Sequence, residues 1–425
     1  MKKCFACLLC LTMLLGIMPV SLAENTEPIT LEFWRPINQA SEENWYKAKV
    51  AEFNELYEGK IFIDDSALTR GDSWAYEDKI AAAAATDSLP DIIFVDGPNL
   101  ANYAYSGLLA PIDEYYTEEE LKDFVPSSLQ QGSYNGSMYA VSLGEGIINL
   151  YYNKTMFAEA GIEVPQTVED AWTWDEFYEI CKTLTTDDVY GTNMLVEKSG
   201  EWLIVGLQNF FVSNGASFIS DDMTTAEGYI NSEAAIEAGQ YIQKLADEGL
   251  MNIDPMSTEF EEGKCATKIA GAWFIPTLDA AKEATGLDWG ITYLPYAKEN
   301  KGSCTGGWQI GITPTCKDAD AAMEFIKWLT STENCASFFY DGPRYLPIRY
   351  SSYELIPDFE EAPYSVLKET LTETGVARPI TPNYPVLTSK FSEAMYDIML
   401  GADVKESLDG IAQAYDAEWQ QTYAK

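Results

Sequence analysis

The chain has no histidine among its 425 residues. This absence excludes a serine or cysteine nucleophile activated by imidazole, an imidazole metal site and the HExxH motif of zinc proteases. No pair of cysteines has the spacing of a metal site either. An enzyme built from this chain would depend on carboxylates, tyrosine or lysine. We expect no catalytic residue, no metal and no cofactor.

Basic residues are scarce. The chain has 27 Lys and Arg against 67 Asp and Glu, a formal net charge of −40. A phosphate backbone or an anionic membrane surface would repel such a chain, which excludes nucleic acid as a partner. The acids are scattered among aromatic and aliphatic residues, so we expect most of them on solvated faces. A hydrophobic content of 47 % argues against disorder.

Only one long apolar run is present, and it lies at the start of the chain. Lys2 and Lys3 precede a run from about Phe5 to Val20, and Ser21-Leu22-Ala23 offers small residues to a signal peptidase. The run is shorter than the roughly 20 residues that a membrane span needs. We expect export with cleavage after Ala23, and an uncleaved anchor is the alternative. No cysteine follows the run where a lipid anchor would need one.

Five cysteines would remain after this cleavage. Because the count is odd, at least one thiol is left unpaired, and we expect most of them to be structural and buried. They are Cys181, Cys265, Cys304, Cys316 and Cys335.

From Thr30 the chain alternates short apolar strands with amphipathic helices. Strands are expected at 30–34, 61–63 and 91–95, with helices between them. This alternation predicts an α/β fold with parallel pairing, and such sheets bind ligands beyond the carboxyl ends of their strands. The loops to inspect are therefore 35–40, 65–71 and 96–100.

The stretch from Gly136 to Phe177 organises the rest of the chain. It has a short alternating strand at 138–141, the acidic turn Gly144-Glu145-Gly146, an apolar run at 147–152 and a helix that ends at Gly161. The order of these residues resembles the central segment of maltose-binding-protein-like proteins. They are the extracellular solute-binding protein family 1, the carbohydrate-binding component of ABC importers. In that family the chain first crosses between two lobes here.

Further pieces in the same order extend the resemblance. They are the strand ending in Leu-Glu-Phe-Trp, the turn at 107–113, the crossing-like segment 260–274 and the Gly306-Gly307-Trp308 loop. The resemblance implies a two-lobed periplasmic-binding-protein-like fold of type II. Each lobe would hold a mostly parallel sheet flanked by helices, hinged by crossing segments. It also implies a monomer whose partners are a carbohydrate and the permease subunits of an ABC transporter.

Because the chain crosses more than once, each lobe should combine two separated stretches. We expect a signal peptide at 1–23, an N-terminal lobe from 24–137 and 271–330, and a C-terminal lobe from 138–270 and 331–425.

The chemistry of a sugar site suggests which side chains to look for. A pyranose ring has an apolar face that can lie on an indole, and a rim of hydroxyls that need partners once water is removed. Stacking candidates are Trp34, Trp273 and Trp308, with Trp202 as a weaker one. Ordinary core packing is the alternative for each of them. Gly271-Ala272-Trp273 fits a backbone that approaches ligand closely.

Among polar residues Glu145 has the strongest case, because it lies between two glycines at the expected crossing. Asp65 and Asp96 follow expected strands, with turn capping as the alternative, and Asn38 lies in the first loop. Arg344, in a Gly-Pro turn, could bind a pair of hydroxyls, although a salt bridge serves equally well there. Gly307 belongs to the loop that carries the family resemblance.

These features favour a non-catalytic protein that encloses a sugar or oligosaccharide between two lobes. A two-lobed binder of a polyamine or peptide is the first alternative, because polyamines also need acids and aromatics. A secreted glycoside hydrolase is the second. It would need two carboxylates at a fixed separation, and no local motif creates that pair.

Overall fold

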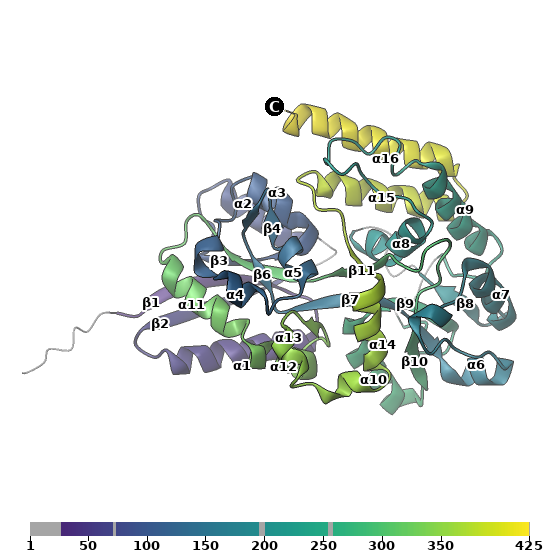
Figure 1. Ribbon diagram of the computed structural model, residues 1–425, viewed down its shortest axis with the longest axis horizontal. Helices are drawn as coiled ribbons and strands as arrows, with labels where there is room; N and C mark the ends of the chain where they lie inside the picture. Colours follow the sequence, from purple (N-terminus) through teal and green to yellow (C-terminus); the bar gives the residue numbers. More distant parts are fainter. Residues whose placement is uncertain (1–26, 71–73, 195–199, 254–257, 425) are drawn as a thin grey trace, which may run out of the picture.

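Two lobes lie side by side in the computed structural model, each around its own β-sheet (Figure 1). The structure describes residues 27–70, 74–194, 200–253 and 258–424. The expected signal peptide and its cleavage site lie outside the described residues. Within them, no helix combines the length and apolarity needed to cross a membrane.

The first lobe holds a five-stranded sheet of order β2-β1-β3-β12-β6. Its strands are β1 (Ile29–Ile37), β2 (Ile61–Thr69), β3 (Ile92–Asp96), β6 (Val141–Ser142) and β12 (Trp308–Ile312). The helices of this lobe are α1 (Ala40–Leu56), α2 (Ala75–Ala84), α3 (Leu100–Tyr105), α4 (Glu118–Leu121), α5 (Pro126–Gln131), α11 (Ala319–Leu329) and α12 (Thr332–Asp341). A small hairpin joins β4 (Ser133–Tyr134) to β5 (Ser137–Met138).

The second lobe is built around the long strand β7, which pairs with β9, β10, β11 and β13. Its strands are β7 (Gly144–Asn153), β8 (Tyr190–Asn193), β9 (Cys265–Gly271), β10 (Trp289–Thr292), β11 (Ser303–Gly306), β13 (Leu346–Pro347) and β14 (Gly375–Ala377). Its helices are α6 (Lys154–Ala160), α7 (Trp174–Leu184), α8 (Trp202–Ser213), α9 (Glu233–Asp247), α10 (Ile275–Thr285), α13 (Tyr350–Tyr353), α14 (Tyr364–Glu369), α15 (Tyr384–Met399) and α16 (Val404–Glu418).

Local sequence explains these elements. In β1, Leu31 and Phe33 face the core while Glu32 is exposed, as the alternation of a half-buried strand requires. Helix α7 begins at a capping box between Thr173 and Glu176, and its apolar residues recur on one buried face. Helix α6 ends at Gly161, whose φ of 68° is left-handed and favours glycine.

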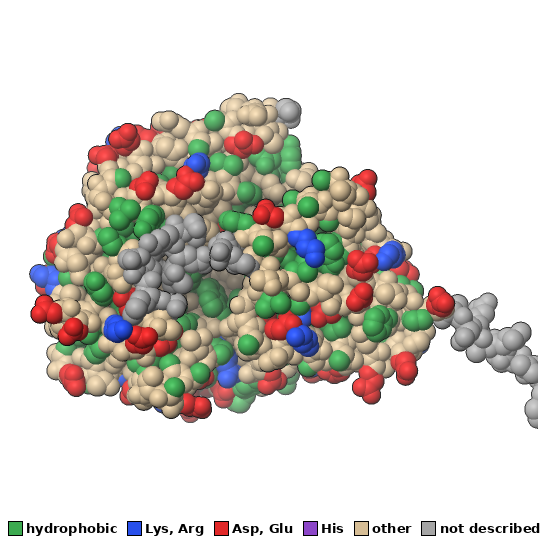
Figure 2. Space-filling model, turned by 180° about the vertical axis from the view of Figure 1, so that it is seen from behind, with side chains coloured by type: hydrophobic (Ala, Val, Ile, Leu, Met, Phe, Trp, Pro, Cys, Tyr) green, Lys and Arg blue, Asp and Glu red, His purple; other side chains and the backbone are tan. Residues whose placement is uncertain are grey.

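Each lobe has its own hydrophobic core. The first gathers side chains from β1, β3, β12, α1 and α11, whereas the second lobe has one core around α8, α15 and α16 and another around α10 and α14. Four of the five expected cysteines are buried, and none of the five forms a disulfide. Acidic side chains are spread over the face seen in Figure 2 and do not gather in one patch.

The sheets are more mixed than the parallel pairing that we expected. β1 pairs with β2 and β3 in parallel, but β12 runs antiparallel to β3, and β7 runs antiparallel to β9, β10 and β11. The reason is the crossing of the chain. Strands that arrive from the other lobe enter the sheet in the opposite direction.

Strand pairing also differs from the expected lobe boundaries in two places. β10 and β11 pair with β7 of the second lobe, although 271–330 was assigned to the first. Helix α12 packs against α1 of the first lobe, although 331–425 was assigned to the second. The chain therefore returns to the first lobe between Gly306 and Trp308, where β11 ends and β12 begins.

The crossings are possible because glycines bring two backbones into contact. A Cβ added to Gly307 would lie 2.2 Å from the carbonyl oxygen of Gly144. Gly144 opens β7 directly after the first crossing, and Gly307 lies in the second. A side chain at Gly307 would push the two crossing segments apart.

A buried ion-pair cluster fastens the edge of the first sheet to helix α1. The Arg35 guanidinium donates to Asp65 from Nε at 2.8 Å and from Nη2 at 2.7 Å, and it also pairs with Glu43. Arg35 is fully buried. Removing one partner of a buried ion pair costs about 3–5 kcal/mol, since the remaining charge is poorly compensated.

Asp65→Ala is therefore expected to lower the free energy of unfolding by about 3 kcal/mol in urea denaturation. The matched control is Asp64→Ala, which removes the exposed carboxylate next to it on β2 and should change stability by less than about 0.5 kcal/mol. Equal effects of the two substitutions would contradict a structural role for the Arg35 cluster.

Candidate functional site

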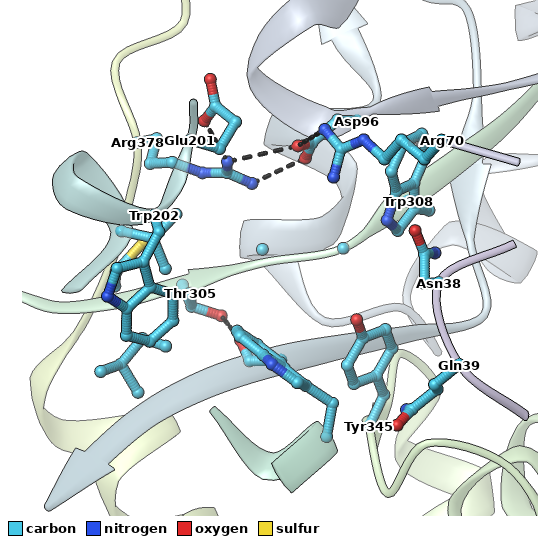
Figure 3. Close-up of a pocket in the computed structure, with 17 residues that line it drawn as sticks. Asn38, Gln39, Arg70, Asp96, Glu201, Trp202, Thr305, Trp308, Tyr345 and Arg378 are labelled. Carbon is cyan, nitrogen blue, oxygen red and sulfur yellow. Dashed lines mark hydrogen bonds and ion pairs between the residues drawn. The ribbon is translucent and has the colours of Figure 1, made fainter. Parts of the chain in front are cut away.

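A cavity of about 250 Å³ lies between the two lobes (Figure 3). The first lobe supplies lining residues from the carboxyl ends of its parallel strands: Asn38 and Gln39 after β1, Arg70 after β2 and Asp96 at the end of β3. The loops after the parallel strands, which the sequence analysis singled out, thus line this cavity.

The second lobe and the crossings supply the other walls. Glu201 and Trp202 lie at the start of α8, Trp273 follows β9, Thr305 lies near the end of β11, and Arg378 follows β14. Of the residues that we expected at the site, the cavity gathers six. They are Asn38, Asp96, Trp202, Trp273, Gly307 and Trp308.

Three aromatic rings form one wall. The rings of Trp202 and Trp273 lie 6.5 Å apart at 90°, and those of Trp273 and Tyr345 lie 5.8 Å apart at 86°. Edge-to-face packing of this kind fixes the orientation of Trp273. The half-buried Trp273 ring is therefore a preorganised platform for the apolar face of a ligand.

Two glycines make room for this platform. A Cβ on Gly146 would lie 2.5 Å from Cζ3 of Trp273, and a Cβ on Gly271 would lie 2.1 Å from the same atom. The ring thus lies flat over β7 and β9, at positions where any side chain would clash. We expected the Gly271 backbone to approach ligand, whereas in the structure it approaches the Trp273 ring.

Trp308 has a different setting. The Arg70 guanidinium lies 4.8 Å from the centre of its ring, a cation–π contact, and the edge of Tyr76 packs 6.0 Å away. Arg70 also pairs with Glu77 at 3.1 Å and lies 3.6 Å from Asp96. Arg70 therefore covers part of Trp308 at the cavity wall (Figure 3), while its Nε and Nη2 donate to Glu77.

Arg378 joins the two lobes inside the cavity. Its Nη2 donates to Oδ1 of Asp96 in the first lobe at 2.7 Å, and its Nη1 donates to Oε2 of Glu201 in the second lobe at 2.7 Å (Figure 3). Burial raises the pKa of Glu201, and Arg378 opposes that shift. Burial alone would lower the pKa of Arg378, but the two carboxylates raise it well above its ordinary value. The guanidinium therefore stays charged at neutral pH.

Expected residues outside the cavity have structural partners. Trp34 lies on the face of β1 toward α2, where the Lys79 ammonium is 4.5 Å from its ring. Asp65 belongs to the Arg35 cluster. Arg344 donates to the carbonyl of Phe339 at 3.3 Å and lies over that ring. None of the three lines the cavity. Trp34 and Asp65 lie within β1 and β2, which run further than the sequence indicated.

Glu145 does not line the cavity but lies directly behind it. It is 1 % exposed and accepts hydrogen bonds from Ser127, from Gln131 and, at 2.8 Å, from Thr305. Ser127 and Gln131 belong to α5, and Thr305 belongs to β11 of the second lobe. Burial raises the pKa of Glu145 to about 7, against the hydrogen bonds from Thr305 and Ser127. Its role is to connect α5 to the crossing strands.

Sequence reasoning missed several lining residues. Arg70 lies within the loop 65–71, which we singled out. Tyr345 directly follows Arg344, a residue that we expected at the site. Glu201 precedes Trp202 in the same way. Arg378 was not among the residues that we expected at the site, and nothing local indicated that its partners lie in two lobes.

The cavity can hold a neutral polar ligand without further chemistry. Its two carboxylates are already paired with arginine. In the part of the chain that the structure describes, no group of three or more Cys, Asp or Glu side chains could hold a metal ion.

Comparisons with known proteins agree with this geometry. The model of a family described as bacterial extracellular solute-binding protein matches residues 49–364. The galactooligosaccharide-binding protein of Bacillus subtilis is 22 % identical over 97 % of this chain and 96 % of its own length. The family model covers most of the residues that line the cavity, whereas Asn38, Gln39 and Arg378 lie outside the range that it matches.

Solved structures extend the likeness to the fold. The cyclic α-maltosyl-1,6-maltose binding protein of Arthrobacter globiformis has a TM-score of 0.78 at 25 % identity, covering 93 % of this chain and 100 % of that one. An ABC transporter solute-binding protein of Thermotoga lettingae, bound to α-D-tagatose, has a TM-score of 0.79 at 22 % identity, covering 92 % and 99 %. The expected two-lobed fold of type II is confirmed.

The raised pKa of Glu145 predicts how stability depends on pH. Because the folded-state pKa of about 7 exceeds the ordinary 4.5, the folded protein binds more protons between these values, and stability falls as pH rises through this window. Glu145→Gln has no carboxyl group to titrate at this position, so the variant does not lose stability in this window. The variant is expected to gain about 3 kcal/mol relative to the parent between pH 4.5 and 8, measured by urea denaturation.

The exposed Glu159→Gln on α6 is the matched control, and its stability should stay within about 0.5 kcal/mol of the parent. A Glu145→Gln difference that is the same at pH 5 and pH 8 would show that this carboxyl does not titrate in that window.

Proposed function

Because the chain belongs to the bacterial extracellular solute-binding proteins, we propose that it captures a neutral carbohydrate between its lobes for an ABC importer. It is a binding protein and not an enzyme. The observation that carries the proposal is the cavity between the lobes, in which Trp273 offers an indole face and Asn38, Arg70 and Thr305 offer polar groups. These are the partners that a sugar ring and its hydroxyls need.

Charge balance favours a sugar over a polyamine. A polyamine would need carboxylates that are free to pair with its ammonium groups. Asp96 and Glu201 both already bind Arg378, and Arg70 adds a second cation 3.6 Å from Asp96. An added cation would meet two arginines, whereas a neutral hydroxyl can accept from either of them.

The size of the cavity favours a short ligand. A volume of about 250 Å³ lies just below the range of most ligand pockets, about 300–1,000 Å³. The names of similar proteins point to the same class, since one binds galactooligosaccharides and another was solved with α-D-tagatose. We therefore favour a monosaccharide or a short oligosaccharide as the ligand.

Delivery follows from closure of the lobes. A ligand that touches both lobes stabilises the closed form, provided that it binds this form better than the open one. The protein would act outside the cytoplasm as a monomer and present the closed form to permease subunits in the membrane. Lobe boundaries near Gly144, at Gly306-Gly307 and after α12 fit this hinge.

A calorimetric panel tests the proposal. Maltotriose, galactooligosaccharides and α-D-tagatose form the sugar arm, and spermidine and a tripeptide form the other arm. We expect at least one sugar to bind and neither of the other solutes to do so. Binding of spermidine or the peptide, with no response to any sugar, would overturn the assignment.

Trp273→Ala is expected to weaken the binding sugar at least tenfold, which is about 1.4 kcal/mol, because the platform is lost. Trp34→Ala is the matched control. Its ring lies outside the cavity against Lys79, so affinity should stay within about twofold of the parent. Calorimetry on both variants measures the two affinities. A loss of affinity in Trp34→Ala but not in Trp273→Ala would instead place the sugar at the Trp34 face of the first lobe.

Arg378→Gln tests the charge argument. The substitution leaves Asp96 and Glu201 without their shared cation, so we expect sugar affinity to fall at least tenfold, about 1.4 kcal/mol, and spermidine to bind. Circular dichroism checks that the variant is folded. A folded variant that binds sugar like the parent and ignores spermidine would contradict the argument.

A further inference from the structure

Asn38 offers the cavity only one of its two polar atoms. Its amide nitrogen Nδ2 donates to the Glu42 carboxylate, 3.1 Å from Oε2 and 3.4 Å from Oε1. In the described part of the chain no group donates to the other atom, Oδ1. Asn38 is exposed and lines the cavity, so Oδ1 is an acceptor available to a ligand.

Glu42 lies behind the cavity wall. It is 3 % exposed and lies close to Trp308 and Tyr345, which also line the cavity. Glu42 belongs to the first turn of α1, one turn after Asn38, so the two side chains meet on the same side of the chain. Among the ion pairs of the described residues, none involves Glu42, because Arg35 is occupied by Asp65 and Glu43.

We propose that Glu42 is a positioning residue that sets the hydrogen-bond polarity of Asn38 toward the ligand. As a carboxylate Glu42 can only accept, so it holds Nδ2 and leaves Oδ1 for a ligand hydroxyl. As a carboxylic acid it can donate to Oδ1. The Asn38 amide then turns over and presents Nδ2, a donor, to the cavity. This inference rests on the proposed function, since it assigns the ligand a hydroxyl donor at Asn38.

Arg70 decides which polarity a sugar prefers. Arg70 and Asn38 flank Trp308 on the same side of the cavity (Figure 3). A guanidinium can only donate, so a hydroxyl that lies between the two accepts from Arg70 and donates to Asn38. Oδ1 accepts the hydrogen of this hydroxyl, whereas Nδ2 would leave that hydrogen without an acceptor at Asn38. The carboxylate form of Glu42 is therefore the binding form.

Near neutral pH Glu42 changes its charge, whereas the groups around it keep theirs. Burial raises the pKa of Glu42 to about 7, against its contact with Asn38 and the positive charges of Arg35 and Arg70. Burial also raises the pKa values of Tyr46 and Tyr345 well above 10, so both stay neutral. Although burial opposes it, the hydrogen bond from Arg35 lowers the pKa of Glu43, which stays ionised.

Nuclear magnetic resonance of the ligand-free protein tests the switch directly. In protein labelled with ¹⁵N-asparagine, the Asn38 side-chain signal is identified by its absence from Asn38→Ala. We expect this signal to shift between pH 6 and pH 8 in the parent and to stay constant in Glu42→Gln. Glu55→Gln removes an exposed carboxyl from the same helix and should titrate like the parent. A signal that does not move, or that moves equally in Glu42→Gln, overturns the inference.

Affinity supplies the second readout, with maltotriose and α-D-tagatose as probes. For a probe that binds, we expect affinity to fall about fivefold from pH 8 to pH 6 in the parent, the value of one neutral hydrogen bond, and to fall less in Glu42→Gln. Equal pH dependence in the two proteins would contradict the role of Glu42 toward the ligand. Failure of all sugars to bind would count against the proposed function, while the resonance still decides whether Glu42 orients Asn38.

Discussion

The interaction on which the rest depends is the guanidinium of Arg378 held between Asp96 and Glu201. Each carboxylate comes from a different lobe, so a single side chain ties the two halves together inside the cavity. Buried charges of this kind are tolerable only when each is paired with good geometry. The pairing therefore neutralises the cavity and fixes the separation of its walls, which makes it suited to an uncharged ligand.

Backbone geometry at the crossings makes that arrangement possible. Gly307 lets two crossing segments touch at Gly144, while Gly146 and Gly271 let the Trp273 ring lie on the strands. Just behind, Glu145 connects α5 to β11 through hydroxyl and amide groups. Gly144 at the crossing and Gly146 beneath the ring both belong to β7, so we expect closure of the lobes to be linked to contact with ligand.

The sequence predicted the α/β fold, the crossing at Gly144-Glu145-Gly146 and six of the 17 residues that line the cavity, because strand ends, glycine pairs and tryptophans carry local signals. It failed where the surroundings of a side chain depend on tertiary packing. Trp34 and Asp65 stand at the ends of the expected strands, but β1 and β2 continue to Ile37 and Thr69, and both side chains contact groups of their own lobe. Arg378 gave no sign of its partners, since they are 282 and 177 residues away in sequence. The side of a strand that meets the other lobe is decided by how the lobes dock.

The central claim is that a sugar is enclosed in this cavity while Arg378 still joins the lobes. A crystal structure of the protein with its bound sugar tests it most directly. The account predicts a ring against Trp273, hydroxyls within hydrogen-bond distance of Arg70 and Asn38, and Arg378 between Asp96 and Glu201. A sugar bound outside the cavity, or one that separates Arg378 from Asp96 to enter it, would contradict the account.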